Sequence, residues 1–174
     1  MSAARRCWLA TAIDVPIYAA LALTLSWPAR EALALLDPGS GVDERMAREL
    51  FAAATNVAIV LFGSAIVAHT VGRLLDSQMR RVPTGRAAVA FAAMGGVLAL
   101  LPTAVLALGQ GDPVAGAVYG IIGIVSPAAL TAATTHLLIG TVAASRTRIR
   151  AVVIAAGAAW LATIGWTAAV VWPF

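Results

Sequence analysis

Long apolar runs constrain this chain more than any other feature of its sequence. A helix needs about 20 mostly apolar residues to cross a hydrocarbon core of roughly 30 Å. Of the 174 residues, 61% are hydrophobic and only 11% are charged, and the mean hydropathy is +0.90, far from the values of soluble domains. The sequence therefore predicts an all-α fold, a polytopic bundle of about five transmembrane helices, with no room for a soluble domain.

The fourth apolar run is the hardest to assign. It extends over Val114–Ser145, which would be roughly 48 Å of helix and is too long for one straight crossing. Ser126-Pro127 is its expected break, so residues 126–145 are predicted to lie shallow or to re-enter the membrane. The predicted spans are Trp8–Trp27, Leu50–Gly72, Ala87–Leu108, Pro113–Val125 with the piece that follows it, and Ala151–Trp172.

The connection between the first two spans is polar. It contains the turn sequence Asp-Pro-Gly-Ser-Gly over residues 37–41, and we expect a short interfacial helix on each side of it. Pro16 lies inside the first span and predicts a kink there.

All 12 positively charged side chains are arginines, and they gather in alternate connections. Cytoplasmic loops carry an excess of positive residues, so the pattern predicts a cytoplasmic N-terminus and a C-terminus outside. Arginine-only, alanine-rich usage is typical of a GC-rich bacterial genome, and we expect a multi-pass protein of the bacterial inner membrane that binds no nucleic acid. The basic groups are Arg5 and Arg6; Arg73, Arg80, Arg81 and Arg86; and Arg146, Arg148 and Arg150.

A single carboxylate, Asp14, lies well inside a predicted span, where a charge costs roughly 2.5 to 3.5 kcal/mol. His69, Arg73 and His136 are expected near the same depth on the cytoplasmic side, and Asn56 is the main polar group on the other side. Two interpretations remain open. Either Asp14 forms a charge pair with Arg73 or Arg6 while the histidines act as interfacial groups, or Asp14, Arg73 and the two histidines belong to a cation or proton path.

Signatures of catalysis and of bound cofactors are missing. The two histidines have no cysteine or glutamate at zinc-ligand spacing, and HExxH, GxSxG and nucleotide-binding glycine motifs do not occur. The one cysteine, Cys7, excludes an internal disulfide. The chain is therefore expected to be no enzyme and to hold neither a metal nor a cofactor.

Three short motifs in series resemble the RDD family of small bacterial membrane proteins. They are "RRCWLATAID", with Arg6, Ala10, Ile13 and Asp14; "HTVGRLL", with Thr70, Gly72 and Arg73; and "HLLIGTVAASRTR", with His136, Gly140 and Thr141. Leu137 stands where the family tends to have an aspartate. The resemblance implies an RDD-like core over residues 1–150, followed by an additional helix over residues 151–174, and it implies transport of an unidentified solute, with ion exchange one suggestion.

Two functions follow as hypotheses. In the first, the chain transports an ion or small solute, or assists a transporter, with Asp14 as the binding carboxylate and Arg73 as its charge partner. In the second, it is a non-catalytic scaffold or assembly subunit that packs against further copies or other membrane subunits in the bilayer. A cavity that reaches Asp14 would favour transport, and a dry Asp14–Arg pair in a sealed bundle would favour the scaffold.

Overall fold

The computed structural model describes residues 2–79, 81–109 and 112–171, and every regular element in those ranges is a helix. Five helical stretches are long and apolar enough to cross a membrane, which confirms the predicted all-α bundle. The elements are α1 (Ala3–Leu36); α2 (Val42–Ala58), η1 (Ile59–Gly63) and α3 (Ser64–His69); α4 (Val71–Met79); α5 (Thr84–Gly109); α6 (Pro113–Gly120), η2 (Ile121–Val125) and α7 (Ser126–Ala143); and α8 (Arg146–Val171).

The expected interfacial helices before the second span do not form as separate elements. Helix α1 continues through Pro16 and Pro28 to Leu36, and α2 begins at Val42, so only residues 37–41 connect them. The Arg45 side chain bonds the Ser40 hydroxyl at 2.7 Å and the carbonyls of Asp37 and Pro38 at 3.1 and 3.0 Å. These bonds fix the short turn, and both flanking segments become ends of long helices.

The prediction that Ser126-Pro127 breaks the fourth span is wrong. Residues 113–143 form one helical stretch of 31 residues, and the π-helical segment η2 ends two residues before the proline. Pro127 has no N–H to offer the carbonyl of Gly123, four residues back. That carbonyl instead accepts a hydrogen bond of 3.2 Å from the Asn56 side-chain amide, so a neighbouring helix satisfies it. The stretch is long and apolar enough to cross a membrane as one helix.

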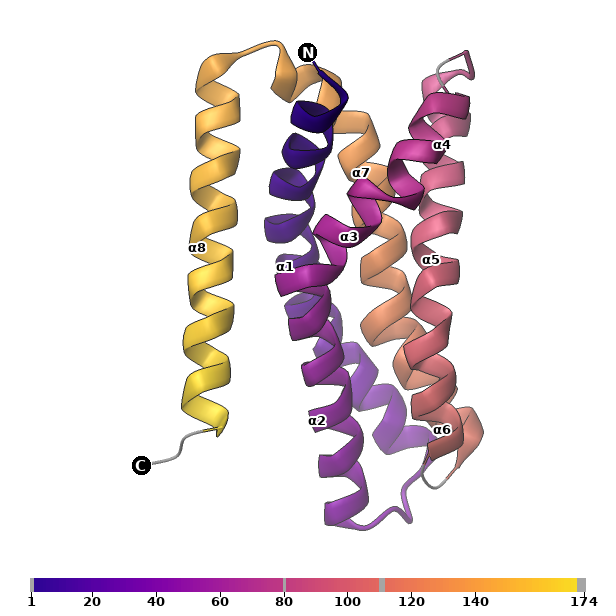
Figure 1. Cartoon of the computed structure of the whole chain (residues 1–174). Helices are drawn as coiled ribbons and strands as arrows, with labels where there is room; N and C mark the ends of the chain where they lie inside the picture. Colours follow the sequence, from indigo (N-terminus) through magenta and orange to yellow (C-terminus); the bar gives the residue numbers. More distant parts are fainter. Residues whose placement is uncertain (1, 80, 110–111, 172–174) are drawn as a thin grey trace.

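Helix α1 occupies the centre of the bundle and packs on α3, α6, α7 and α8, while α5 packs mainly on α6 and α7 (Figure 1). Gly95 permits the close approach of α5 and α7, since a Cβ atom there would lie 2.7 Å from the carbonyl oxygen of Ala128. Helix α8 lies at the edge of the bundle against α1 (Figure 1).

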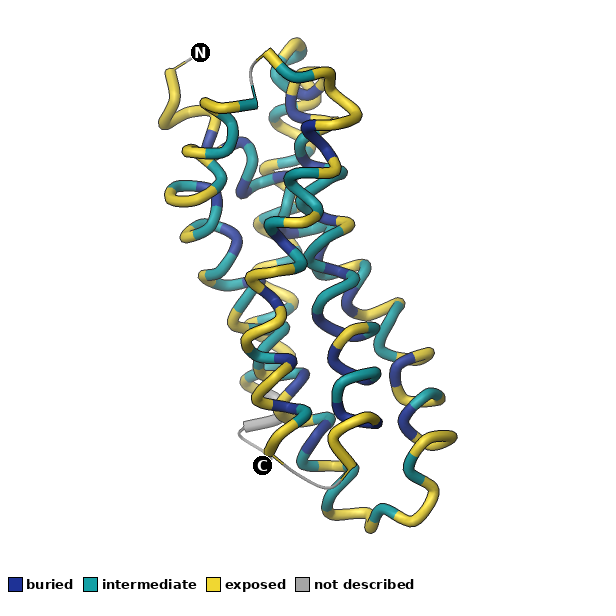
Figure 2. The backbone as a smooth tube through the Cα atoms, turned by 90° about the vertical axis from the view of Figure 1, so that its right-hand side faces the viewer, coloured by how far each residue is buried: buried dark blue, intermediate teal, exposed yellow. Residues whose placement is uncertain are grey.

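The surface of the bundle is apolar. Figure 2 shows buried positions as short segments on the inner sides of the helices, with exposed positions between them. Large side chains such as Leu35, Leu101 and Leu108 are 80%, 74% and 82% exposed. A soluble protein would not leave so much apolar surface in water, whereas lipid covers it without cost.

The first turn of α1 and the last described turn of α8 lie at opposite ends of the bundle (Figure 1). We call the end with the N-terminus, the loop near residue 82 and the turn at residues 144–145 the basic end, because Arg5, Arg6, Arg81, Arg86 and Arg146 lie there. The opposite end, with the turn of residues 37–41, is called the far end. This arrangement agrees with the predicted alternation of arginines along the chain. Two predicted positions, Arg80 and Trp172, lie outside the described residues.

Candidate functional site

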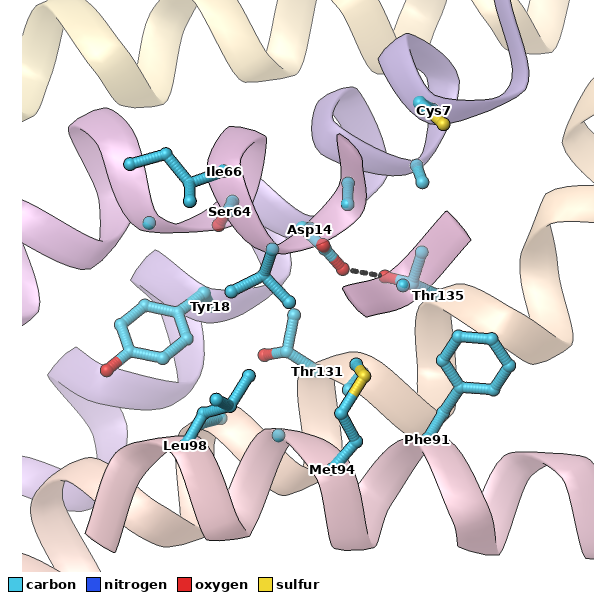
Figure 3. A pocket seen from close by; sticks show the side chains of 18 of the residues that line it. Cys7, Asp14, Tyr18, Ser64, Ile66, Phe91, Met94, Leu98, Thr131 and Thr135 are labelled. Atoms are coloured by element: carbon cyan, nitrogen blue, oxygen red, sulfur yellow. Dashed lines mark hydrogen bonds between the residues drawn. The ribbon is translucent and has the colours of Figure 1, made fainter. Parts of the chain in front are cut away.

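A cavity of about 1110 Å³ lies between α1, α5, α7 and the segment η1–α3–α4. Its wall is mostly apolar, with side chains that include Phe62, Ile66, Met94 and Leu98 (Figure 3). The lining reaches α4 and the first turns of α1 at the basic end. Toward the far end the helices are closely packed around a buried cluster, whose members are Ala29, Leu33, Ala52, Ala99, Leu106, Ala115, Tyr119 and Ile124.

Asp14 projects into this cavity from α1, and its carboxylate accepts a hydrogen bond from the hydroxyl of Thr135 on α7 (Figure 3). The two helices are held together beside this contact by Leu9 and Ile13 of α1, which pack on Ile139 of α7. Positions 9 and 13 form one face of α1, and position 14 is turned away from them by one residue. Packing of the apolar face therefore aims the carboxylate at the cavity.

Thr131 lies one helical turn before Thr135 and shares its face of α7. Its side chain is only 4% exposed, it lines the cavity, and its hydroxyl oxygen has no hydrogen-bond partner. Buried hydroxyls are ordinarily bonded. Sequence reasoning did not single out Thr131 as a site residue, although the spacing of Thr131 and Thr135 is a signal that could have found both.

Tyr18 closes the far side of the cavity. It lies one turn after Asp14 on α1 and is 1% exposed, and its hydroxyl donates to the side-chain oxygen of Asn56 at 2.6 Å. The Asn56 amide donates in turn to the carbonyl of Gly123 in η2. This chain of hydrogen bonds joins α1, α2 and η2 between the cavity and the packed cluster below it.

The predicted pairing of Asp14 with Arg73 does not occur. Across the ranges that the structure describes, Asp14 forms no ion pair, and Thr135 is its hydrogen-bond partner. Arg6 forms an ion pair with Asp76 of α4 at 3.0 Å, so the two charges compensate each other at the mouth of the cavity. Arg73 does line the cavity, but from α4, beyond the break at Thr70 that turns this segment out of the line of α3.

The two histidines lie in different surroundings. His136 lines the cavity and stacks on Phe91 with ring centroids 4.5 Å apart. His69 is not part of the cavity lining: its ring meets Trp8 edge to face at 4.7 Å, and its Nδ1 atom donates to the carbonyl of Ala65 at 2.9 Å. Of the four residues predicted to cluster, the cavity thus collects Asp14, Arg73 and His136.

The residues of the RDD-like motifs lie partly on the cavity and partly outside it. Arg6, Ala10 and Gly72 line it, whereas Ile13 packs between α1 and α7. Thr70 caps the end of α3, and its hydroxyl donates to the Ile66 carbonyl at 2.6 Å. The other two, Gly140 and Thr141, are exposed on α7 and take no part in the cavity.

A second polar cluster was not predicted. Arg48 is 1% exposed near the far end, and its guanidinium bonds the carboxylates of Asp37 at 3.0 Å and Glu44 at 2.8 Å. Arg30 bonds Glu49 at 3.2 Å nearby. The Glu44–Arg48 spacing of four residues was a visible signal for part of this cluster. All of these residues precede the predicted span Leu50–Gly72, so they belong to the polar connection and Asn56 remains the polar group expected within the span on this side.

No family model, curated protein or solved structure matches this chain.

Proposed function

We propose that the chain is a transporter of an ion or small solute, with Asp14 as its binding carboxylate. The observation that carries the proposal is the cavity itself, which reaches an acidic side chain that none of the described arginines neutralises. A carboxylate inside a span is costly, so its presence on a cavity wall is a sign of function rather than of packing.

The shape of the cavity supports the same proposal. Its lining extends to the basic end, whereas the buried cluster toward the far end has only Ala99 on the cavity wall. A transporter that exposes its binding site to one side at a time needs such one-sided access. The alternative function, a scaffold or assembly subunit, calls for a sealed bundle and has no use for this space.

The segment opposite α5 has the features of a moving part. Helix α3 ends at Thr70, whose backbone angles of φ −107° and ψ −97° are non-helical, and α4 continues in another direction (Figure 1). The π-helical segment η1 ends about two turns earlier in the same stretch. Breaks and π-bulges of this kind are frequent at functional hinges. We propose that α3 and α4 move relative to α5 when access changes sides.

We further place the chain in the inner membrane of a bacterium with its basic end in the cytoplasm. This orientation rests on the arginines of alternate connections, which lie at one end of the bundle (Figure 1). In that orientation the cavity is accessible from the cytoplasm.

The test is a flux assay on the purified protein in proteoliposomes across a panel of monovalent cations. Asp14→Asn keeps the shape of the side chain and removes its charge, and we expect it to lower the flux at least tenfold. Asp43→Asn is the matched control, since Asp43 is an exposed acid in the first turn of α2, at the far end. Equal flux in Asp14→Asn and wild type would contradict the role of Asp14.

A further inference from the structure

The cavity is much larger than an inorganic cation needs. A water molecule occupies about 30 Å³ of liquid, and pockets for drug-sized ligands span roughly 300 to 1,000 Å³. At about 1110 Å³ the cavity belongs with the latter. Within the described ranges, no group of three His, Cys, Asp or Glu side chains could hold a metal ion. Size and ligand supply therefore both point to an organic molecule.

The deep part of the cavity offers one negative charge and unused hydrogen-bonding capacity. Asp14 supplies the charge, and Thr131, buried with an unpartnered hydroxyl, points into the same space (Figure 3). Thr135 already donates to Asp14 and so orients it. The arrangement suits a positively charged group of a ligand, because an anion would meet the carboxylate in a poorly hydrated site.

The rest of the wall suits an apolar body. Met94 and Leu98 project from α5, and Phe62 and Ile66 come from η1 and α3. Aromatic rings on this wall also attract cations through their faces. Positive side chains enter the described lining only toward the basic end, where Arg6 is neutralised by Asp76 and Arg73 lies on α4.

One side of the cavity opens at the depth of the hydrocarbon core. Phe62, Ile66 and Leu98 line the cavity and yet are 64%, 61% and 43% exposed. Phe62 and Leu98 lie well inside their candidate spans, and Ile66 lies near the end of its span. In the described part of the chain α3 does not pack closely on α5. A molecule that partitions into lipid can reach such an opening, whereas a hydrated ion cannot.

We propose that this cavity binds an amphipathic organic cation, whose charged centre lies against Asp14 and whose apolar body lies against Phe62, Met94 and Leu98. The ligand enters sideways between α3 and α5. This inference rests on the proposed transport function and specifies the class of its substrate.

The experiment measures equilibrium binding of tetraphenylphosphonium to the full chain in lipid nanodiscs. Tetraphenylborate is the matched probe, because it has nearly the same size and shape and the opposite charge. We expect saturable binding of the cation that weakens at least tenfold in Asp14→Asn, and no saturable binding of the anion. Equal binding of the cation by wild type and Asp14→Asn would overturn the proposal, as would saturable binding of the anion to the wild type.

A pair of tryptophan variants on α5 tests the apolar part of the site. Met94→Trp fills the cavity and should weaken tetraphenylphosphonium binding at least fivefold, whereas Val97→Trp adds the same bulk to a side chain that is 64% exposed and outside the lining. If Met94→Trp does not fold, Leu98→Trp takes its place. Equal binding by the filling variant and the Val97→Trp control would overturn the proposed position of the ligand.

Failure of this inference and failure of the transport proposal give different results. If flux of an inorganic cation depends on Asp14 but binding of tetraphenylphosphonium is the same in wild type and Asp14→Asn, the organic-cation proposal is overturned and the transport proposal is supported. Asp14-dependent binding of tetraphenylphosphonium without flux of it or of any cation supports the site and contradicts transport.

Discussion

Two charged side chains, Arg48 and Asp14, lie inside the bundle, and their surroundings differ. Arg48 near the far end is 1% exposed and bonds two carboxylates, so its charge is compensated within the protein. Asp14 lies on the wall of a large cavity and bonds only a hydroxyl among the described residues. The charge of Arg48 is enclosed by its partners, whereas the carboxylate of Asp14 can still bind a ligand.

The difference separates structural charge from functional charge. A buried ion pair whose partners are all present contributes little on balance, but losing one partner leaves an uncompensated charge and costs several kcal/mol. A carboxylate without a cationic partner keeps its charge available for a ligand. The variants below test this contrast, beginning with the largest expected effect on the free energy of unfolding.

Arg48→Ala should destabilise the protein most. It removes the buried guanidinium that bonds the carboxylates of Asp37 and Glu44, and because these are 18% and 31% exposed and can be hydrated, we expect a loss near the lower end of the range for a broken buried pair, about 3 kcal/mol. The measurement is unfolding in mixed micelles by titration with dodecyl sulfate. Arg30→Ala is the control: its side chain is 56% exposed, so its pair with Glu49 should contribute no more than about 1 kcal/mol. Similar losses in the two variants would contradict the enclosed role of Arg48.

The sequence predicted the positions of the helices better than it predicted which side chains contact one another. Apolar runs of sufficient length predict spans whatever the bundle looks like, and Asp14 was recognisable as an acid inside such a run. The partner of Asp14 was not recognisable, because Thr135 follows it by 121 positions and meets it only through the packing of α1 on α7. Charge suggested Arg73 instead, but the break at Thr70 lies between that residue and the rest of its span.

The fourth span shows why the boundaries were missed. A serine and a proline inside an apolar run ordinarily indicate a helix end. Here the π-helical segment and the Asn56 amide satisfy the backbone around Pro127, and neither can be foreseen from the local sequence. Arg48 was missed for a related reason, since its partner Asp37 belongs to a turn whose conformation decides the contact.

Thr135→Val should have the next largest effect. The variant keeps the shape of the side chain and removes the only described hydrogen bond to the Asp14 carboxylate. Hydrogen bonds to charged groups contribute about 1.5 to 3 kcal/mol, and we expect a loss of stability in that range from the same titration. Thr135→Ser retains the hydroxyl and should keep most of the stability that Thr135→Val loses. If Thr135→Ser were as unstable as Thr135→Val, the methyl group and not the hydrogen bond would be responsible.

Tyr18→Phe should cost less, about 1 to 2 kcal/mol, because it removes a neutral hydrogen bond and leaves the side-chain oxygen of Asn56 unsatisfied. A double-mutant cycle with Asn56→Leu isolates the interaction. Once Asn56 is replaced, the further change at Tyr18 should cost clearly less than it does alone. Strictly additive losses would show that the hydroxyl does not depend on Asn56.

Asp14→Asn should have the smallest effect on stability, within about 1 kcal/mol of wild type, although it is the variant expected to lower binding and flux at least tenfold. The amide keeps an oxygen that can accept from Thr135, and it relieves the protein of a charge that no cation compensates. The same unfolding titration, run beside the binding assay, measures both quantities on one preparation. A loss comparable to that of Arg48→Ala would remove the contrast between the two charges, because it would make Asp14 a structural residue as well. Unchanged stability with lost binding is the combination that only a carboxylate kept for a ligand produces.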